Sequence, residues 1–96
     1  MMNAMRFTAE IERLGIPLPT VKACLVKSMG SLLGETPRDA TVYHIKLNEC
    51  DRVEHVAARL ILIFGEGATL LLEATLKECE KLKKGREKPA SRVSGP

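Results

Sequence analysis

The stretch that decides the fold runs from Asn48 to Leu82, NECDRVEHVAARLILIFGEGATLLLEATLKECEKL, and it predicts two helices joined by a glycine-flanked turn. Gly65 stands where a helix often ends in a left-handed conformation, and Asp51 is expected to cap the first helix with Glu54 as its capping-box partner. Apolar residues recur at steps of three and four, so each helix has one apolar face and the two should pack against each other. The faces consist of Val53, Val56, Ala57, Leu60, Ile61 and Phe64, and of Ala68, Leu71, Leu72, Thr75, Leu76, Cys79 and Leu82.

The N-terminal part predicts two further helices. The first spans about Asn3 to Leu14 and ends at Gly15, and the second begins near Pro19, because proline is tolerated in a first helical turn. Between Gly30 and His44 turn residues interrupt the pattern, and we interpret TVYHI as an extended loop. The second helix should bury Leu18, Val21, Leu25, Ser28, Met29 and Leu32, with Cys24 as a small core filler beside them.

The chain of 96 residues predicts one helical domain over residues 1–84 and a polar, disordered tail or linker over residues 85–96. The net charge is +3, and the three cations and one acid after Gly85 supply +2 of it. The helical part is therefore close to neutral. A DNA reader usually carries a concentrated basic surface, so this balance argues against nucleic acid as the main partner.

Cysteine usage and the N-terminus point to a cytoplasmic protein. The three cysteines, Cys24, Cys50 and Cys79, are an odd number without CxxC spacing, so we expect them to be unpaired in a reducing compartment. The first ten residues lack the apolar run of a signal peptide, and LILIF is too short to cross a membrane.

No motif of catalysis, metal binding or cofactor binding stands out. Cys50 and His55 are five positions apart, which does not place them on one helix face, and a zinc site would need further ligands. The GEG of residues 65–67 lacks a preceding strand and a following Lys-Ser/Thr, so it predicts a turn instead of a phosphate cradle. We therefore expect no enzyme, no cofactor and no metal.

The second half of the chain resembles a pyrin domain, a branch of the death-fold superfamily. The residues that carry the resemblance are Asp51-Arg52, Val53, Val56, Leu60-Ile61, Phe64, Gly65, Ala68 and Thr75-Leu76, and Ile11 to Leu14 is similar to the family's first helix. The second helix departs from the family, because Val21, Cys24 and Leu25 stand where paired Phe residues are usual. The family's sixth helix is not visible, since LKECEKLKK continues the fifth.

The resemblance implies an all-α antiparallel bundle of five to six helices, similar to the death fold. It also implies a homotypic interaction module of innate-immune, inflammasome or cell-death signalling, whose partners are other pyrin-like domains or further copies of itself. Contact would join an acidic surface on the first and fourth helices to a basic surface on the second and third. The acidic surface would comprise Glu10, Glu12, Asp51 and Glu54, and the basic surface Lys22, Lys27, Arg38 and Lys46.

Two other functions stay open from the sequence. A small DNA-binding or regulatory protein would use the helix with Lys22 and Lys27, together with the basic tail, to contact phosphates. A helical homodimer would bury Leu62, Ile63 and Leu70, which lie off the two apolar faces.

Overall fold

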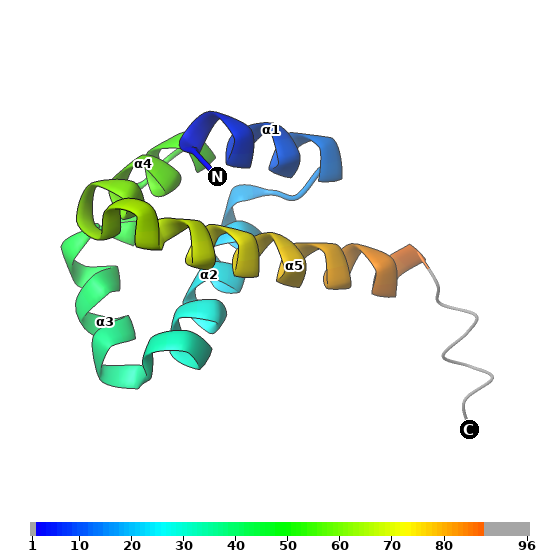
Figure 1. Ribbon diagram of the computed structural model, residues 1–96. Helices are drawn as coiled ribbons and strands as arrows, with labels where there is room; N and C mark the ends of the chain where they lie inside the picture. The colour runs from blue at the N-terminus through cyan, green and yellow to red at the C-terminus, as the bar shows by residue number, and fades with distance from the viewer. Residues whose placement is uncertain (1, 88–96) are drawn as a thin grey trace, which may run out of the picture.

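The computed structural model describes residues 2–87, with side chains through Lys84, and within this range the secondary structure is helical with no strand. A 3-10 turn, η2 (Gly65–Gly67), joins α4 directly to α5, so the five α-helices form four uninterrupted runs. A second 3-10 turn, η1 (Leu47–Glu49), lies before α4. The α-helices are α1 (Ala4–Leu14), α2 (Leu18–Leu33), α3 (Glu35–His44), α4 (Val53–Phe64) and α5 (Ala68–Glu87) (Figure 1).

The ends of α1 confirm the first predicted helix. The Asn3 Oδ1 accepts a 2.7 Å hydrogen bond from the Arg6 amide, which satisfies a donor of the opening turn. Gly15 has φ 70°, and its amide donates to the carbonyls of Ile11 and Glu12. Glycine takes this left-handed conformation without the steric penalty that other residues incur, so the helix stops there.

The second predicted helix begins where it was expected, but a residue near its end that was predicted to be buried is exposed. α2 has Pro17 as its N-cap residue and Pro19 in its first turn. Cys24 fills the core as predicted. The prediction that Leu32 is buried is wrong, because its side chain is 54% exposed. Leu32 has the spacing of the buried residues of α2, but it lies at the end of that helix, where its side chain is not covered.

The interpretation of TVYHI as an extended loop is wrong, since these residues belong to α3 and the connection that follows it. Pro37, which was interpreted as a turn residue, lies in the first turn of α3, where the missing amide would have no helical partner anyway. Thr41 is buried and Val42 packs on the core. Packing against α2 therefore outweighs the β propensity of this short segment.

The predicted cap of α4 is also wrong. Arg52 occupies the N-cap position and makes no side-chain cap hydrogen bond. Asp51 lies one residue too early, and its Oδ1 is 2.9 Å from Nδ1 of His55. Its carboxylate thus meets a side chain one turn further on, and Glu54 has no capping partner.

α4 ends at Gly65 as predicted, but the residue's φ of 59° and ψ of −129° lie outside the left-handed helical region that was expected there. The helical run Val53–Lys84 is long and apolar enough, by length and composition, to span a membrane. However, η2 separates α4, of 12 residues, from α5, which has 20 residues and continues past Lys84, and both helices contribute side chains to the same core. Core packing accounts for part of this apolar character, and Leu62, Ile63, Leu70 and Leu82 of the same run are exposed.

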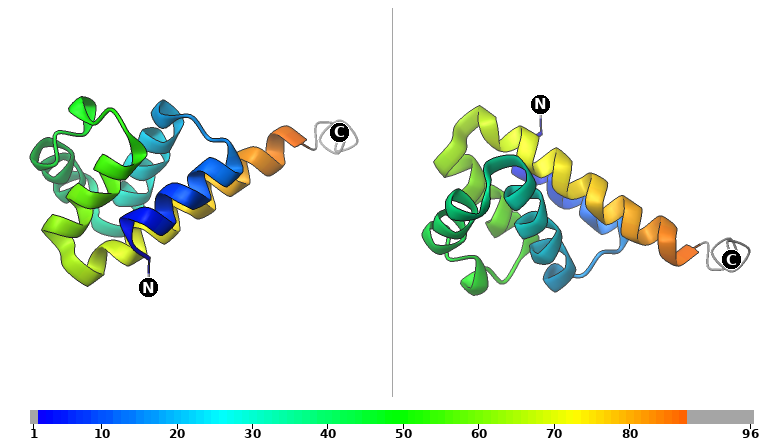
Figure 2. Two further views of the ribbon diagram at one scale, coloured as in Figure 1. Left: turned by 90° about the horizontal axis from the view of Figure 1, so that it is seen from above. Right: turned by 90° about the horizontal axis from the view of Figure 1, so that it is seen from below.

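α5 is the central element of the bundle, and it contacts α1, α2 and α4 (Figure 2). α1 packs mainly on α4, and α3 packs on α2, so two helix pairs are arranged around α5. α4 and α5 do contact each other, as predicted, but α4 makes its broadest contact with α1 and α5 with α2. The most completely buried side chains are Phe7, Ile11, Val21, Leu25, Met29, Ile45, Val56, Leu60, Leu72, Thr75 and Cys79.

The C-terminal part of the domain reaches further than expected. α5 continues through Glu87, three residues past the predicted boundary at residue 84. The described range holds five α-helices, and a sixth does not occur before residue 88. The remainder of the predicted tail, residues 88–96, lies outside the described residues.

Candidate interaction surfaces

The predicted acidic residues lie on one helix pair and the basic residues on the other. Glu10 and Glu12 are on α1, while Asp51 and Glu54 are at the start of α4. Lys22 and Lys27 are on α2, Arg38 is on α3, and Lys46 follows α3 directly. α1 packs on α4 and α3 packs on α2, and Lys46 lies in the connection that leads from α3 to α4.

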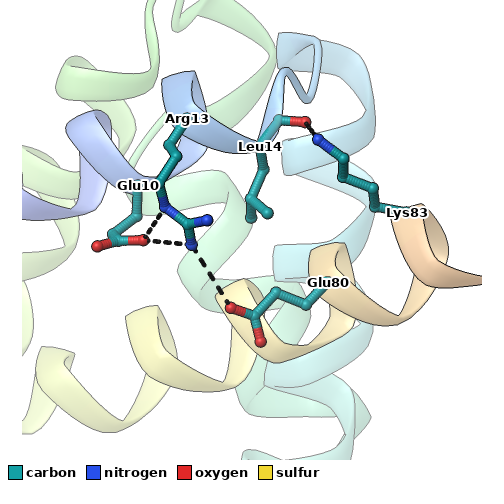
Figure 3. A network of polar contacts seen from close by, with 5 residues as sticks. All are labelled: Glu10, Arg13, Leu14, Glu80 and Lys83. Carbon is teal, nitrogen blue, oxygen red and sulfur yellow. Dashed lines mark hydrogen bonds and ion pairs between the residues drawn. The ribbon is translucent and has the colours of Figure 1, made fainter.

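On the acidic pair, Glu10 forms an ion pair and Asp51 has a histidine neighbour. On α1, the Nη2 of Arg13 is 2.7 Å from Oε1 of Glu10 and 3.9 Å from Oε2 of Glu80 on α5 (Figure 3). At the start of α4, Asp51 meets His55. Arg13, a positive charge among the predicted acidic residues, is thereby held beside Glu10.

On the basic pair, two of the four predicted cations also have ion-pair partners within the chain. The Lys27 Nζ is 3.1 Å from Oε1 of Glu78 on α5, and Lys81 is 3.5 Å from the other oxygen. The hydrogen bond from Lys27 lowers the pKa of the Glu78 carboxyl. On α3, the Nε of Arg38 is 2.9 Å from Oδ1 of Asp39. Lys27 and Arg38 are thus compensated inside the chain.

Four of the eight predicted residues make no ion pair with another side chain of residues 2–84. They are Glu12 and Glu54 on the acidic pair, and Lys22 and Lys46 on the basic pair. Lys22 is half-buried and the other three are exposed. These four are therefore the charges with the most freedom to meet a partner.

Tyr43 is an exposed aromatic residue that the sequence analysis missed as a surface feature. It lies on α3 with 80% of its surface exposed, and its ring meets the ring of His44 edge-on. It borders a shallow hollow with Lys46, Asn48 and Glu49. In a chain with one Tyr, two Phe and no Trp, its isolation was the available signal.

Two hydrogen bonds to carbonyls hold the bundle ends in place. The Nζ of Lys83 donates a 3.0 Å bond to the carbonyl of Leu14, the last residue of α1 (Figure 3). A cation at a helix C-terminus also complements the helix dipole. The Nη1 of Arg59 donates a 2.8 Å bond to the carbonyl of Ile45, which ties α4 to the end of α3.

Within the described residues, no group of three or more His, Cys, Asp or Glu side chains is placed to hold a metal ion. Cys24, Cys50 and Cys79 are unpaired and buried. Leu62 and Leu70, which the homodimer alternative requires, are 85% and 68% exposed, and Ile63 is partly exposed.

Comparison with known proteins found no matching family model, no matching curated protein and no matching solved structure.

Proposed function

We propose that this chain is a cytoplasmic homotypic interaction module of the death-fold type, which joins pyrin-like domains, including further copies of itself, in innate-immune or cell-death signalling. The observation that carries the proposal is the division of unpaired charge. Glu12 lies on α1 and Glu54 at the start of α4, whereas Lys22 lies on α2 and Lys46 follows the end of α3.

The mechanism is a head-to-tail contact. The acidic pair of one copy meets the basic pair of the next, so every bound copy leaves one surface of each kind free. Such a heterologous contact adds copies in one direction and forms a filament unless the rotation closes a ring. Complementary charge would steer the copies together and fix their register.

Tyr43 supplies the apolar part of the same contact. It lies beside Lys46 on the basic pair, and aromatic residues are enriched among those that contribute most to protein binding. A large exposed ring with one hydroxyl adds contact area at a small cost in side-chain entropy. Complementary charge would then set the orientation of the two copies, and burial of Tyr43 in the contact would stabilise the complex.

Charge reversal tests the proposal. Glu12→Lys adds a cation in the last turn of α1, and Lys22→Glu adds an anion near the start of α2, so the helix dipole favours both changes. Each variant places like charges opposite each other in the assembly, which can cost several kcal/mol. Glu73→Lys and Lys77→Glu on the exposed side of α5 are matched controls with the same changes in net charge.

The experiment measures sedimentation of the wild type, each variant and the mixture of Glu12→Lys with Lys22→Glu, with circular dichroism to verify equal helix content. Each variant alone should stay small, the α5 controls should assemble, and the mixture should regain assembly because alternating copies pair opposite charges. If both variants assemble like the wild type, the proposed surfaces are wrong. A closed dimer that Leu62→Gln dissociates would favour the homodimer instead.

A further inference from the structure

A row of three exposed side chains runs along the outer side of α4. Glu54, Ala58 and Leu62 follow each other at steps of four positions, so they lie on one side of the helix, and all three are exposed. Glu54 makes no ion pair with another side chain of residues 2–84, and Leu62 is 85% exposed. At 1.5 Å per residue this α4 row is about 12 Å long, with an anion at one end and a large apolar side chain at the other.

The hollow at the end of α3 has the complementary features. It has a volume of about 570 Å³, and its lining includes Val42 and Tyr43 of α3 together with Lys46 of the connection to α4. The half-buried Val42 and the ring of Tyr43 form an apolar wall. Lys46 is exposed and supplies a cation without an ion-pair partner in residues 2–84.

The backbone that carries Lys46 is held in place from several sides. The neighbours of Lys46 in sequence, Ile45 and Leu47, are both buried in the core. The Lys46 amide donates a 3.1 Å hydrogen bond to the carbonyl of Tyr43, and the Sγ of Cys50 lies 3.7 Å from the Lys46 carbonyl. A partner that binds in the hollow therefore has little backbone to order, which lowers the cost of binding.

We propose that the α4 row of one copy docks in this hollow on the next copy. Glu54 pairs with Lys46 at one end of the row. The small side chain of Ala58 leaves room for the ring of Tyr43, and Leu62 is buried against the apolar wall. The inference rests on the proposed function, because it assigns the residues and the direction of the same head-to-tail contact.

The other charges of the hollow are compatible with this direction. Asp39 lines the hollow and has an ion-pair partner on its own helix, at 2.9 Å. Glu49 also lines the hollow, and it makes no ion pair within residues 2–84. Arg52 is exposed two positions before Glu54, so it would meet Glu49 of the other copy and add a second pair of opposite charge. Two such pairs favour one orientation of the row over its reverse.

Zero-length cross-linking tests the charged end of the contact. A carbodiimide joins a carboxylate to an amine only where the two touch, and an equal mixture of isotope-labelled and unlabelled full-length chain shows by mass spectrometry whether a link joins different copies. The expected product is an amide between Glu54 of one copy and Lys46 of another. Glu54→Gln should abolish this product, and Glu73→Gln on the exposed side of α5 is the matched control that should leave it unchanged.

Sedimentation over a concentration series tests the apolar end. Leu62→Gln should raise the concentration needed for half-maximal assembly by about tenfold or more, because a leucine side chain loses its burial in the contact. Leu70→Gln is the matched control, since it makes the same change at a side chain that is 68% exposed on α5, outside the α4 row. It should leave that concentration unchanged, and circular dichroism should show equal helix content for both variants.

The results separate this inference from the proposed function. If Glu12→Lys and Lys22→Glu stop assembly while Leu62→Gln and Leu70→Gln have equal effects, the proposed function stands and the docking of the α4 row is wrong. The same holds if the wild type assembles and the Glu54–Lys46 link is missing or is confined to single copies. A wild type that stays monomeric overturns both.

Discussion

Truncation of Leu60 on α4 gives a direct test of the packing of the bundle. Leu60 is 0% exposed and belongs to the core, whereas Leu62, half a turn away on the same helix, is 85% exposed. Removing a buried leucine side chain to alanine costs about 2–5 kcal/mol, from lost transfer free energy and from the cavity that remains. Leu62→Ala removes the same atoms from a position in water and should change the stability by no more than about 0.5 kcal/mol.

A domain of this size has a free energy of unfolding of about 5–14 kcal/mol, so Leu60→Ala removes a large share of it. In urea, with a slope of about 1 kcal/mol per molar, the unfolding midpoint should fall by about 2–5 M for Leu60→Ala and hardly move for Leu62→Ala. Helical circular dichroism through a urea titration measures both midpoints. Equal losses of stability for the two variants, or a larger loss for Leu62→Ala, would refute the assignment of Leu60 to the buried face of α4 and of Leu62 to its exposed face.

Three more predictions concern polar groups. The Ser28 hydroxyl is buried without a hydrogen-bond partner among the described residues, so Ser28→Ala should raise the free energy of unfolding by about 1 kcal/mol, and a loss in urea titration would contradict this. The lowered pKa of Glu78 stabilises the fold above its ordinary value of 4.5, and this contribution is lost as pH falls through the lowered pKa. The stability difference between wild type and Glu78→Gln should therefore shrink on acidification, and an equal difference at pH 7 and pH 3 would refute the link to Lys27. Lys83→Met keeps the aliphatic stem but removes the bond to Leu14, so amide exchange in the last turn of α1 should accelerate while α3 stays unchanged.

Local signals predicted the helices that carry a strong apolar stripe. Asn3 and Gly15 mark the ends of α1, and the stripes of α4 and α5 matched the buried residues from Val56 to Cys79. α3 was missed because its first turn contains Pro37 and its later residues have β propensity. Its helical state depends on packing against α2, which lies outside any short window of sequence.

The sequence could predict which charged residues form the candidate surfaces and which helices carry them. It could not predict which of these charges pair with other groups of the same chain. Spacing within a helix can indicate the Glu10–Arg13 pair, because three positions separate them. Lys27 with Glu78, and Lys83 with the Leu14 carbonyl, join residues that are 51 and 69 positions apart. Their contacts depend on how α5 crosses α2 and α1, and this crossing determines which charges stay free.

Sedimentation velocity of the wild-type chain, over a concentration series at low and at high salt, tests the central claim most directly. Assembly through complementary charge should produce species that grow with concentration at low salt and return to monomer as salt screens the contact. A chain that stays monomeric at every concentration at low salt would contradict homotypic assembly. A dimer of constant size that is insensitive to salt would contradict the charged surfaces as its cause.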